Sequence, residues 1–243
     1  MIVKPVIRNS ICMTAHPEGC AALVHDWIGR ARAAYPSIHE AATLSCRPLP
    51  KAVLVLGCSS GYGLASRISA SFACGAKTVG VSYEREPGAD ATASPGWYNN
   101  RAFDREAAAA GMYAATYSMD AYSDKAREEV IHRARLDGLQ FDQVIYSLAS
   151  PVRRDPKTGH LHKSTIRPFG EAFSGTTIDP FTGQMSQISI DPASDDRAEG
   201  TVKVMGGEDW ELWIDALLKA GVLARNCVTI AYSYIGPEHS WPI

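Results

Sequence analysis

One stretch, residues 52–64, constrains the fold more than any other part of this 243-residue chain. It begins with an unbroken apolar run at 52–56, which is typical of a strand buried on both faces of a parallel sheet. The run is followed by three glycines, Gly57, Gly61 and Gly63. Apolar residues then recur at every fourth position over 64–72, as in a helix packed on a sheet. The stretch therefore predicts a strand, a glycine turn and a helix, in that order.

This arrangement suits a dinucleotide, because glycines let the backbone approach a pyrophosphate and the start of the helix attracts its charge. The spacing is Gly-x-x-x-Gly-x-Gly, which differs from the usual Gly-x-Gly-x-x-Gly. A tight turn in an unrelated α/β fold is the alternative interpretation.

Glu84 strengthens the dinucleotide interpretation. It ends a second expected strand, 78–83, about 20 residues beyond the turn, where an acid that bonds the adenosine ribose hydroxyls is expected. A carboxylate there favours NADH and disfavours NADPH, although Arg85 beside it could instead face a 2′-phosphate. A solvated acid at a strand end is the other interpretation of Glu84.

Strand and helix patterns alternate through the first part of the chain. The expected strands are 52–56, 78–83, 113–119 and 141–147, and helices are expected from Leu64 onward, at 101–110 and at 124–137. Strands joined in this way run parallel, so their carboxyl ends meet along one edge. Gly57, Glu84, Asp120 and Ala149 fall at those ends. We predict an α/β fold, a Rossmann-like doubly wound parallel sheet with one extended cofactor along that edge.

The whole chain, residues 1–243, is expected to form a single domain, because its amino-acid composition shows no marked change from one part to another. Its expected parts are a lead-in at 1–50 with a helix at 21–34, a nucleotide-binding core at 51–150, inserted hairpins at 151–192, and helices and a strand at 193–243.

The parts after the first strands have further expected features. A long loop is expected at 85–100, and the inserted hairpins carry two copies of an Asp-Pro-x-Thr-Gly turn. Helices are expected at 194–205 and 208–220, and a buried strand at 227–233. The hairpin region also contains four basic residues, which could bind a phosphate group carried by the substrate or could simply form a solvated basic loop: Arg153, Arg154, Lys163 and Arg167.

Composition narrows the function classes. The 24 Lys and Arg against 26 Asp and Glu give a net charge of −2 with both signs interspersed, which argues against nucleic acid or an anionic membrane as partner. The six cysteines form no Cys-x-x-Cys pair, so neither a disulfide framework nor a metal site is expected. No run approaches membrane-spanning length, and we expect a cytoplasmic protein.

A more specific signal comes from motifs spread over the whole chain. They lie at 7–12, 15–20, 57–63, 95–99, 146–151, 204–210 and 232–238. On these residues the chain resembles the NADH-dependent trans-2-enoyl-CoA reductases and the similar FabV-type enoyl-acyl carrier protein reductases. Both are elongated relatives of the short-chain dehydrogenases. The resemblance implies hydride transfer from NADH to the β-carbon of a 2-enoyl thioester, followed by protonation, in fatty acid synthesis.

The resemblance also implies roles for individual residues. Six consecutive residues would hold the pyrophosphate: Gly57, Cys58, Ser59, Ser60, Gly61 and Tyr62. Pairs of residues would hold the other parts of the cofactor: Tyr83 and Glu84 the adenosine ribose, Asp120 and Ala121 the adenine, and Leu148 and Ala149 the nicotinamide-side ribose. Tyr234 matches the family's substrate-contacting tyrosine, and a donor near the thioester carbonyl would stabilise the enolate.

The chain departs from the family at its end. The family's proton-donating tyrosine, with a lysine nine positions later, would begin directly after Ile243, so no catalytic residue is assigned. Losing one transition-state donor costs roughly 10² to 10³ in rate, so we expect a partial reductase, without the family's C-terminal segment and nearly inactive alone.

Two alternatives stay open. The first is a catalytically silent NAD(H)-binding module or subunit. The second, weaker one is a carbonyl-reducing short-chain dehydrogenase, for which no tyrosine has a lysine four positions later. The expected partner is a small acyl thioester on CoA or an acyl carrier protein, and the expected state is a monomer or weak dimer.

Overall fold

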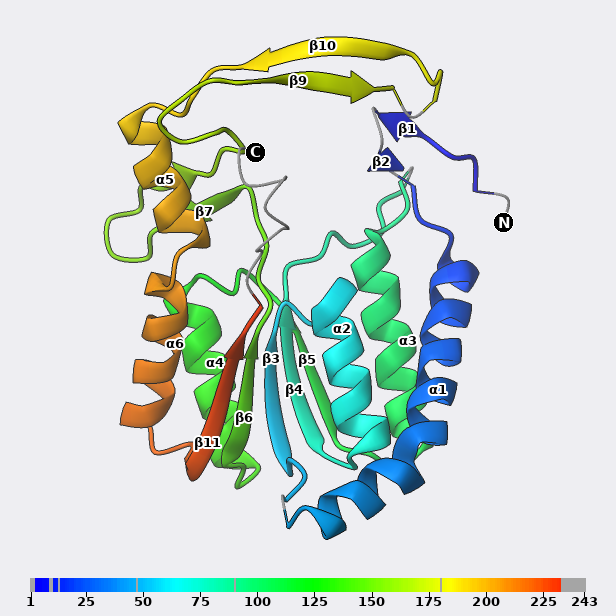
Figure 1. Ribbon diagram of the computed structural model, residues 1–243. Helices are drawn as coiled ribbons and strands as arrows, with labels where there is room; N and C mark the ends of the chain where they lie inside the picture. The colour runs from blue at the N-terminus through cyan, green and yellow to red at the C-terminus, as the bar shows by residue number, and fades with distance from the viewer. Residues whose placement is uncertain are drawn as a thin grey trace. The chain divides into compact units, whose positions relative to one another are not determined.

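The computed structural model describes residues 3–8, 11–12, 14–46, 48–89, 91–179 and 181–232 (Figure 1). The chain divides into two compact units. The first contains residues 1–148 and 212–232, and the second has residues 149–211 as its described part.

A five-stranded sheet forms the centre of the first unit. Its strands are β3 (Ala52–Leu56), β4 (Lys77–Ser82), β5 (Ala114–Ser118), β6 (Phe141–Tyr146) and β11 (Leu223–Ala231). All neighbours pair in parallel, in the order β11-β6-β3-β4-β5. The chain therefore moves outward from β3 to β5 and then returns to the other side of β3, which is the strand-order reversal of a doubly wound sheet. The predicted Rossmann-like fold is confirmed.

Helices cover both faces of this sheet (Figure 1). One face is covered by α1 (Pro17–Leu44), α2 (Gly61–Ile68) with its π-helical continuation (Ser69–Ala73), and α3 (Pro95–Ala109). The other face is covered by α4 (Asp124–Leu136) and α6 (Glu208–Lys219). Only residues 212–219 of α6 belong to this unit. The first face holds a core in which Val24 and Ile28 of α1 pack with Leu64 and Phe72. This packing fixes the start of α2 against the sheet. A short antiparallel pair, β1 (Ile7–Arg8) and β2 (Ile11–Cys12), precedes α1.

Two helices begin earlier than the sequence pattern predicts. In α1, His16 is the N-cap, and its Nδ1 accepts a hydrogen bond from the Gly19 N–H at 3.1 Å. Pro17 is the first residue of the helix. In α3, Ser94 and Pro95 start the helix, so the expected loop at 85–100 ends at Ser94. Proline at the first helical position has its φ preset and needs no N–H partner there.

The strand expected to be buried at 227–233 differs most from the prediction. β11 pairs with β6 alone among the described strands, and Val228 is 56% exposed. Its sequence is apolar enough for a central strand, but its position at the end of the sheet leaves side chains open to solvent.

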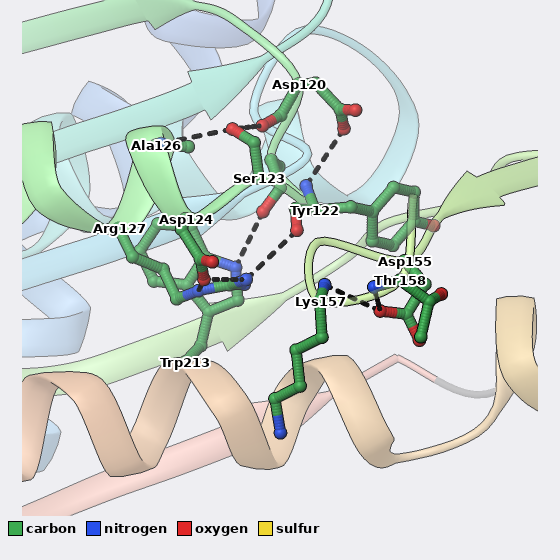
Figure 2. Close-up of polar contacts among 11 residues, drawn as sticks. Asp120, Tyr122, Ser123, Asp124, Ala126, Arg127, Asp155, Lys157, Thr158 and Trp213 are labelled. Carbon is green, nitrogen blue, oxygen red and sulfur yellow. Dashed lines mark hydrogen bonds and ion pairs between the residues drawn. The ribbon is translucent and has the colours of Figure 1, made fainter. Parts of the chain in front are cut away.

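The second unit contains the two predicted hairpins and a helix. The hairpins are β7 (Val152–Arg154) with β8 (Leu161–Lys163) and β9 (Phe173–Ile178) with β10 (Met185–Ile190), and the helix is α5 (Asp195–Met205). In the first turn, Asp155 Oδ1 accepts from the N–H groups of Lys157 and Thr158 at 2.7 and 3.0 Å (Figure 2). Asp179 accepts two equivalent bonds. These hydrogen bonds lower the pKa of both aspartates.

Across the residues that the structure describes, no helix is both long enough and apolar enough to traverse a lipid bilayer.

Candidate functional site

The glycine turn joins β3 to α2 at the point where the strand order reverses. Gly57 has φ +87°, and a Cβ there would overlap the Ser147 carbonyl, whose carbon would be 2.7 Å away. A Cβ on Gly63 would overlap the Gly57 carbonyl in the same way, with its carbon at 2.9 Å. The turn therefore packs against the end of β6 as closely as backbone allows, and only glycine fits at these two positions.

The backbone N–H groups of the glycine turn differ from those at the start of α2 in whether they already have a partner. The Gly57 and Cys58 N–H groups both donate to the Val81 carbonyl, at 2.8 and 3.2 Å. Ser60 is the N-cap but makes no side-chain capping bond, and Ser60 and Gly61 are exposed. The first N–H groups of a helix have no partner within it, so those of α2 remain for a ligand.

Glu84 lies at the carboxyl end of β4, next to the turn. Its Oε1 accepts a hydrogen bond from Ser59 Oγ, and its Oε2 accepts one from Ser94 Oγ. Tyr83 beside it is exposed. The guanidinium of Arg85 donates to the Thr92 carbonyl at 3.1 Å, so Arg85 is held by its own loop. The carboxylate, and not the cation, is the charge placed against the turn.

Asp120 follows β5 and shapes the next turn along the same edge (Figure 2). Its Oδ1 accepts from the Tyr122 N–H at 3.0 Å, and its carbonyl accepts from Ser123 Oγ at 2.6 Å. Ala121 is buried, and its carbonyl accepts from the indole N–H of the fully buried Trp213 at 2.9 Å. The Asp120 and Ala121 positions are thus fixed by α4 and α6.

A buried polar network lies beneath the glycine turn, and the sequence analysis missed it. Arg67 of α2 is fully buried, donates to the Ala115 carbonyl at 2.9 Å and places a nitrogen 3.8 Å from Cys58 Sγ. From α3, Asn99 donates to the Ser59 carbonyl at 3.0 Å, and Asn100 contacts Cys58 Sγ at 3.7 Å. Burial raises the pKa of the Cys58 thiol, which faces this network and not the exposed side of the turn.

Comparison with known proteins identifies the family. A family model described as the trans-2-enoyl-CoA reductase catalytic region matches residues 91–243. A second, described as the NAD(P)H binding domain of trans-2-enoyl-CoA reductase, matches residues 2–89. The chain belongs to the trans-2-enoyl-CoA reductase family. The resemblance read from the motifs is confirmed.

Two curated relatives and a solved structure are similar to nearly all of this chain. The trans-2-enoyl-CoA reductase (NADH) of Treponema denticola is 53% identical over 98% of the chain and 59% of that protein. The enoyl-acyl-carrier-protein reductase (NADH) of Opitutus terrae is 48% identical over 100% of the chain and 59% of that protein. The crystal structure of the Treponema denticola reductase in complex with NAD superposes with a TM-score of 0.93, at 52% identity, over 100% of this chain and 60% of that one. The chain spans about three fifths of the length of these relatives.

The remaining residues that the family resemblance singled out follow β6 or lie outside the described residues. Leu148, partly buried, follows β6 at the end of the first unit, whereas Ala149, exposed, begins the second. Tyr234 lies outside the described residues.

The cations of the hairpin region have different environments. Arg153 is almost completely buried, donates to Glu208 Oε2 at 2.6 Å and to the Lys203 carbonyl at 2.7 Å, and so supports the second unit. Arg154 donates to Gly159 and Arg167 to Asp191, both to backbone carbonyls, and Lys163 is exposed. Arg153 is therefore structural, contrary to its suggested role in binding a phosphate.

No group of three or more His, Cys, Asp or Glu side chains suited to a metal ion occurs within the described ranges.

Proposed function

We propose that this chain is the NADH-binding portion of a reductase that converts trans-2-enoyl thioesters, on CoA or an acyl carrier protein, to saturated acyl thioesters in fatty acid synthesis. One observation carries the proposal. The glycine turn stands at the reversal of strand order in a chain that matches a trans-2-enoyl-CoA reductase bound to NAD with a TM-score of 0.93.

The turn fits a dinucleotide on its own geometry. Gly57 and Gly63 have no room for a side chain, so the backbone itself faces the edge of the sheet. We propose that the pyrophosphate lies against residues 57–62, with contacts to backbone N–H groups and to the Ser60 hydroxyl, because the start of α2 supplies both donors and the positive end of a dipole.

The other cofactor contacts follow the carboxyl ends of the strands. Tyr83 and Glu84 would hold the adenosine ribose and Asp120 with Ala121 the adenine, while Leu148 and Ala149 would lie against the nicotinamide-side ribose. Glu84 would accept hydrogen bonds from ribose hydroxyls, whereas a 2′-phosphate would meet a negative charge there. This favours NADH over NADPH.

When bound, NADH supplies the hydride. The residues of this chain bind and orient it, and Tyr234 would donate a hydrogen bond to the thioester carbonyl and stabilise negative charge on that oxygen. A monomeric or weakly dimeric state and a cytoplasmic location stay predictions from the sequence.

Two measurements test the proposal. Titration calorimetry with the 243-residue chain should register NADH binding that is tighter than NADPH binding. The parent protein should oxidise NADH, followed as loss of the absorbance of the reduced nicotinamide, when crotonyl-CoA or a longer enoyl thioester is supplied. No binding of either coenzyme, or no absorbance loss at any chain length, would reject the assignment.

A further inference from the structure

The carboxylate of Glu84 is held by residues from two other elements. Ser59 in the glycine turn donates to Oε1, and Ser94, the N-cap of α3, donates to Oε2. Gly96, in the first turn of α3, lies directly against the carboxylate. A Cβ on Gly96 would overlap Oε1 and would be 2.7 Å from Oε2.

These contacts fix the position of the Glu84 carboxylate. A glutamate side chain on a surface samples several rotamers, and holding it in one costs conformational entropy. The two hydrogen bonds from the serine hydroxyls to the carboxylate offset that cost. The Ser94 hydroxyl is not used to cap α3, so its hydrogen bond to Glu84 does not compete with a capping bond.

We propose that Ser94 and Gly96 determine coenzyme specificity by holding Glu84 in the one position from which it accepts a ribose hydroxyl and repels a 2′-phosphate. This inference rests on the proposed function, because it assumes that the adenosine ribose lies at Glu84. Ser94 and Gly96 are positioning residues that act through Glu84.

Gly96→Ala is the sharpest test, because alanine is compatible with the helical backbone at this position and its Cβ would displace the carboxylate. Alanine is the better helix former, so the melting temperature should stay the same or rise. The dissociation constant for NADH should increase about 10-fold, as for loss of one hydrogen bond to a charged group. The dissociation constant for NADPH should stay the same or decrease.

The double variant Gly96→Ala/Glu84→Ala separates this mechanism from a general disturbance of the site. Once Glu84 is removed, the new methyl group has no carboxylate to displace. The ratio of the NADH and NADPH constants should then equal that of Glu84→Ala alone, within about 2-fold. A further change of the ratio in the double variant would show that Gly96 acts on something other than Glu84, which overturns the proposal.

Ser94 gives an independent test with a conservative control. Ser94→Ala removes the donor to Oε2 and should reduce the preference for NADH, whereas Ser94→Thr keeps a hydroxyl and should restore it. All constants are measured by calorimetry on the same 243-residue chain.

The outcomes separate this inference from the proposed function. Wild-type chain that binds neither coenzyme overturns both. If the wild-type chain binds NADH but Gly96→Ala and Ser94→Ala leave the ratio of the NADH and NADPH dissociation constants unchanged, only the inference is overturned.

Discussion

At the scale of single residues, the glycine turn shows how backbone geometry restricts sequence. Gly57 and Gly61 both have positive φ, at +87° and +53°. Their surroundings differ, because a Cβ on Gly57 would run into the Ser147 carbonyl whereas a Cβ on Gly61 would meet nothing within 4 Å. The two glycines therefore separate the cost of left-handed backbone from the cost of close packing.

Gly57→Ala should lower the free energy of unfolding by about 3 kcal/mol or more, because strain and steric overlap act together. Gly61→Ala should lower it by about 1 kcal/mol, the cost of the left-handed conformation alone. Urea denaturation of both variants under the same conditions measures the difference. Equal losses would show that the Ser147 carbonyl does not restrict the turn.

Residue patterns predicted the turn but not the partners of Glu84. Strand 52–56 was evident because five consecutive apolar residues are buried together. The hydroxyls that hold Glu84 come from Ser59 and Ser94, which are 25 and 10 residues away in sequence, and no local pattern encodes those contacts. The burial of Arg67 was equally hidden, because a charged residue on a helix usually faces solvent.

At the scale of elements, the early start of α3 matters most for the candidate site. The helix begins at Pro95, which places Ser94 and Gly96 against Glu84 and brings Asn99 to the Ser59 carbonyl. Ser94 followed by Pro95 is a helix-start signal, and it could have been found before the structure was known. The exposed position of β11 had no such signal, since strand order depends on the whole fold.

In the second unit, Glu208 joins α6 to two neighbouring cations. It accepts from Arg153 at 2.6 Å and from Lys203 at 2.9 Å. Hydrogen bonds from Lys203 and Arg153 lower its pKa from the ordinary value of 4.5. Because the folded-state pKa is lowered, the stability it contributes is present above the ordinary pKa and is lost as the pH falls through the lowered value.

Between about pH 5 and pH 3, the free energy of unfolding should therefore decrease less steeply with falling pH in Glu208→Gln than in the wild type. The carboxylate is 41% exposed, so solvent screening keeps its contribution below about 1 kcal/mol. Thermal unfolding at a series of pH values measures it, and Glu199→Gln on the exposed side of α5 is the matched control. Asp155 and Asp179, whose pKa values are also lowered, are present in the wild type and in Glu208→Gln, so their contributions cancel in the difference between the two. An unchanged acid slope in Glu208→Gln would contradict the role of this carboxylate.

At the scale of the whole molecule, coenzyme binding should stabilise the chain unevenly. A ligand that binds only the native state, at 100 times its dissociation constant, adds about 2.7 kcal/mol to the free energy of unfolding. All the described residues proposed to contact NADH, except Ala149, belong to the first unit. Slower hydrogen exchange should therefore appear at the glycine turn, the end of β4 and the start of α3.

The hairpin of β9 and β10 gives the internal control for this prediction, because it contributes none of the proposed contacts. Its amides should exchange at nearly the ligand-free rate when NADH is present, and NADPH at the same concentration should protect the glycine turn less. Equal protection of the hairpin and the turn would mean that the coenzyme acts on the fold as a whole. It would then not be bound where β3, β4 and β6 end, and the assignment of residues 57–62 to its pyrophosphate would be wrong.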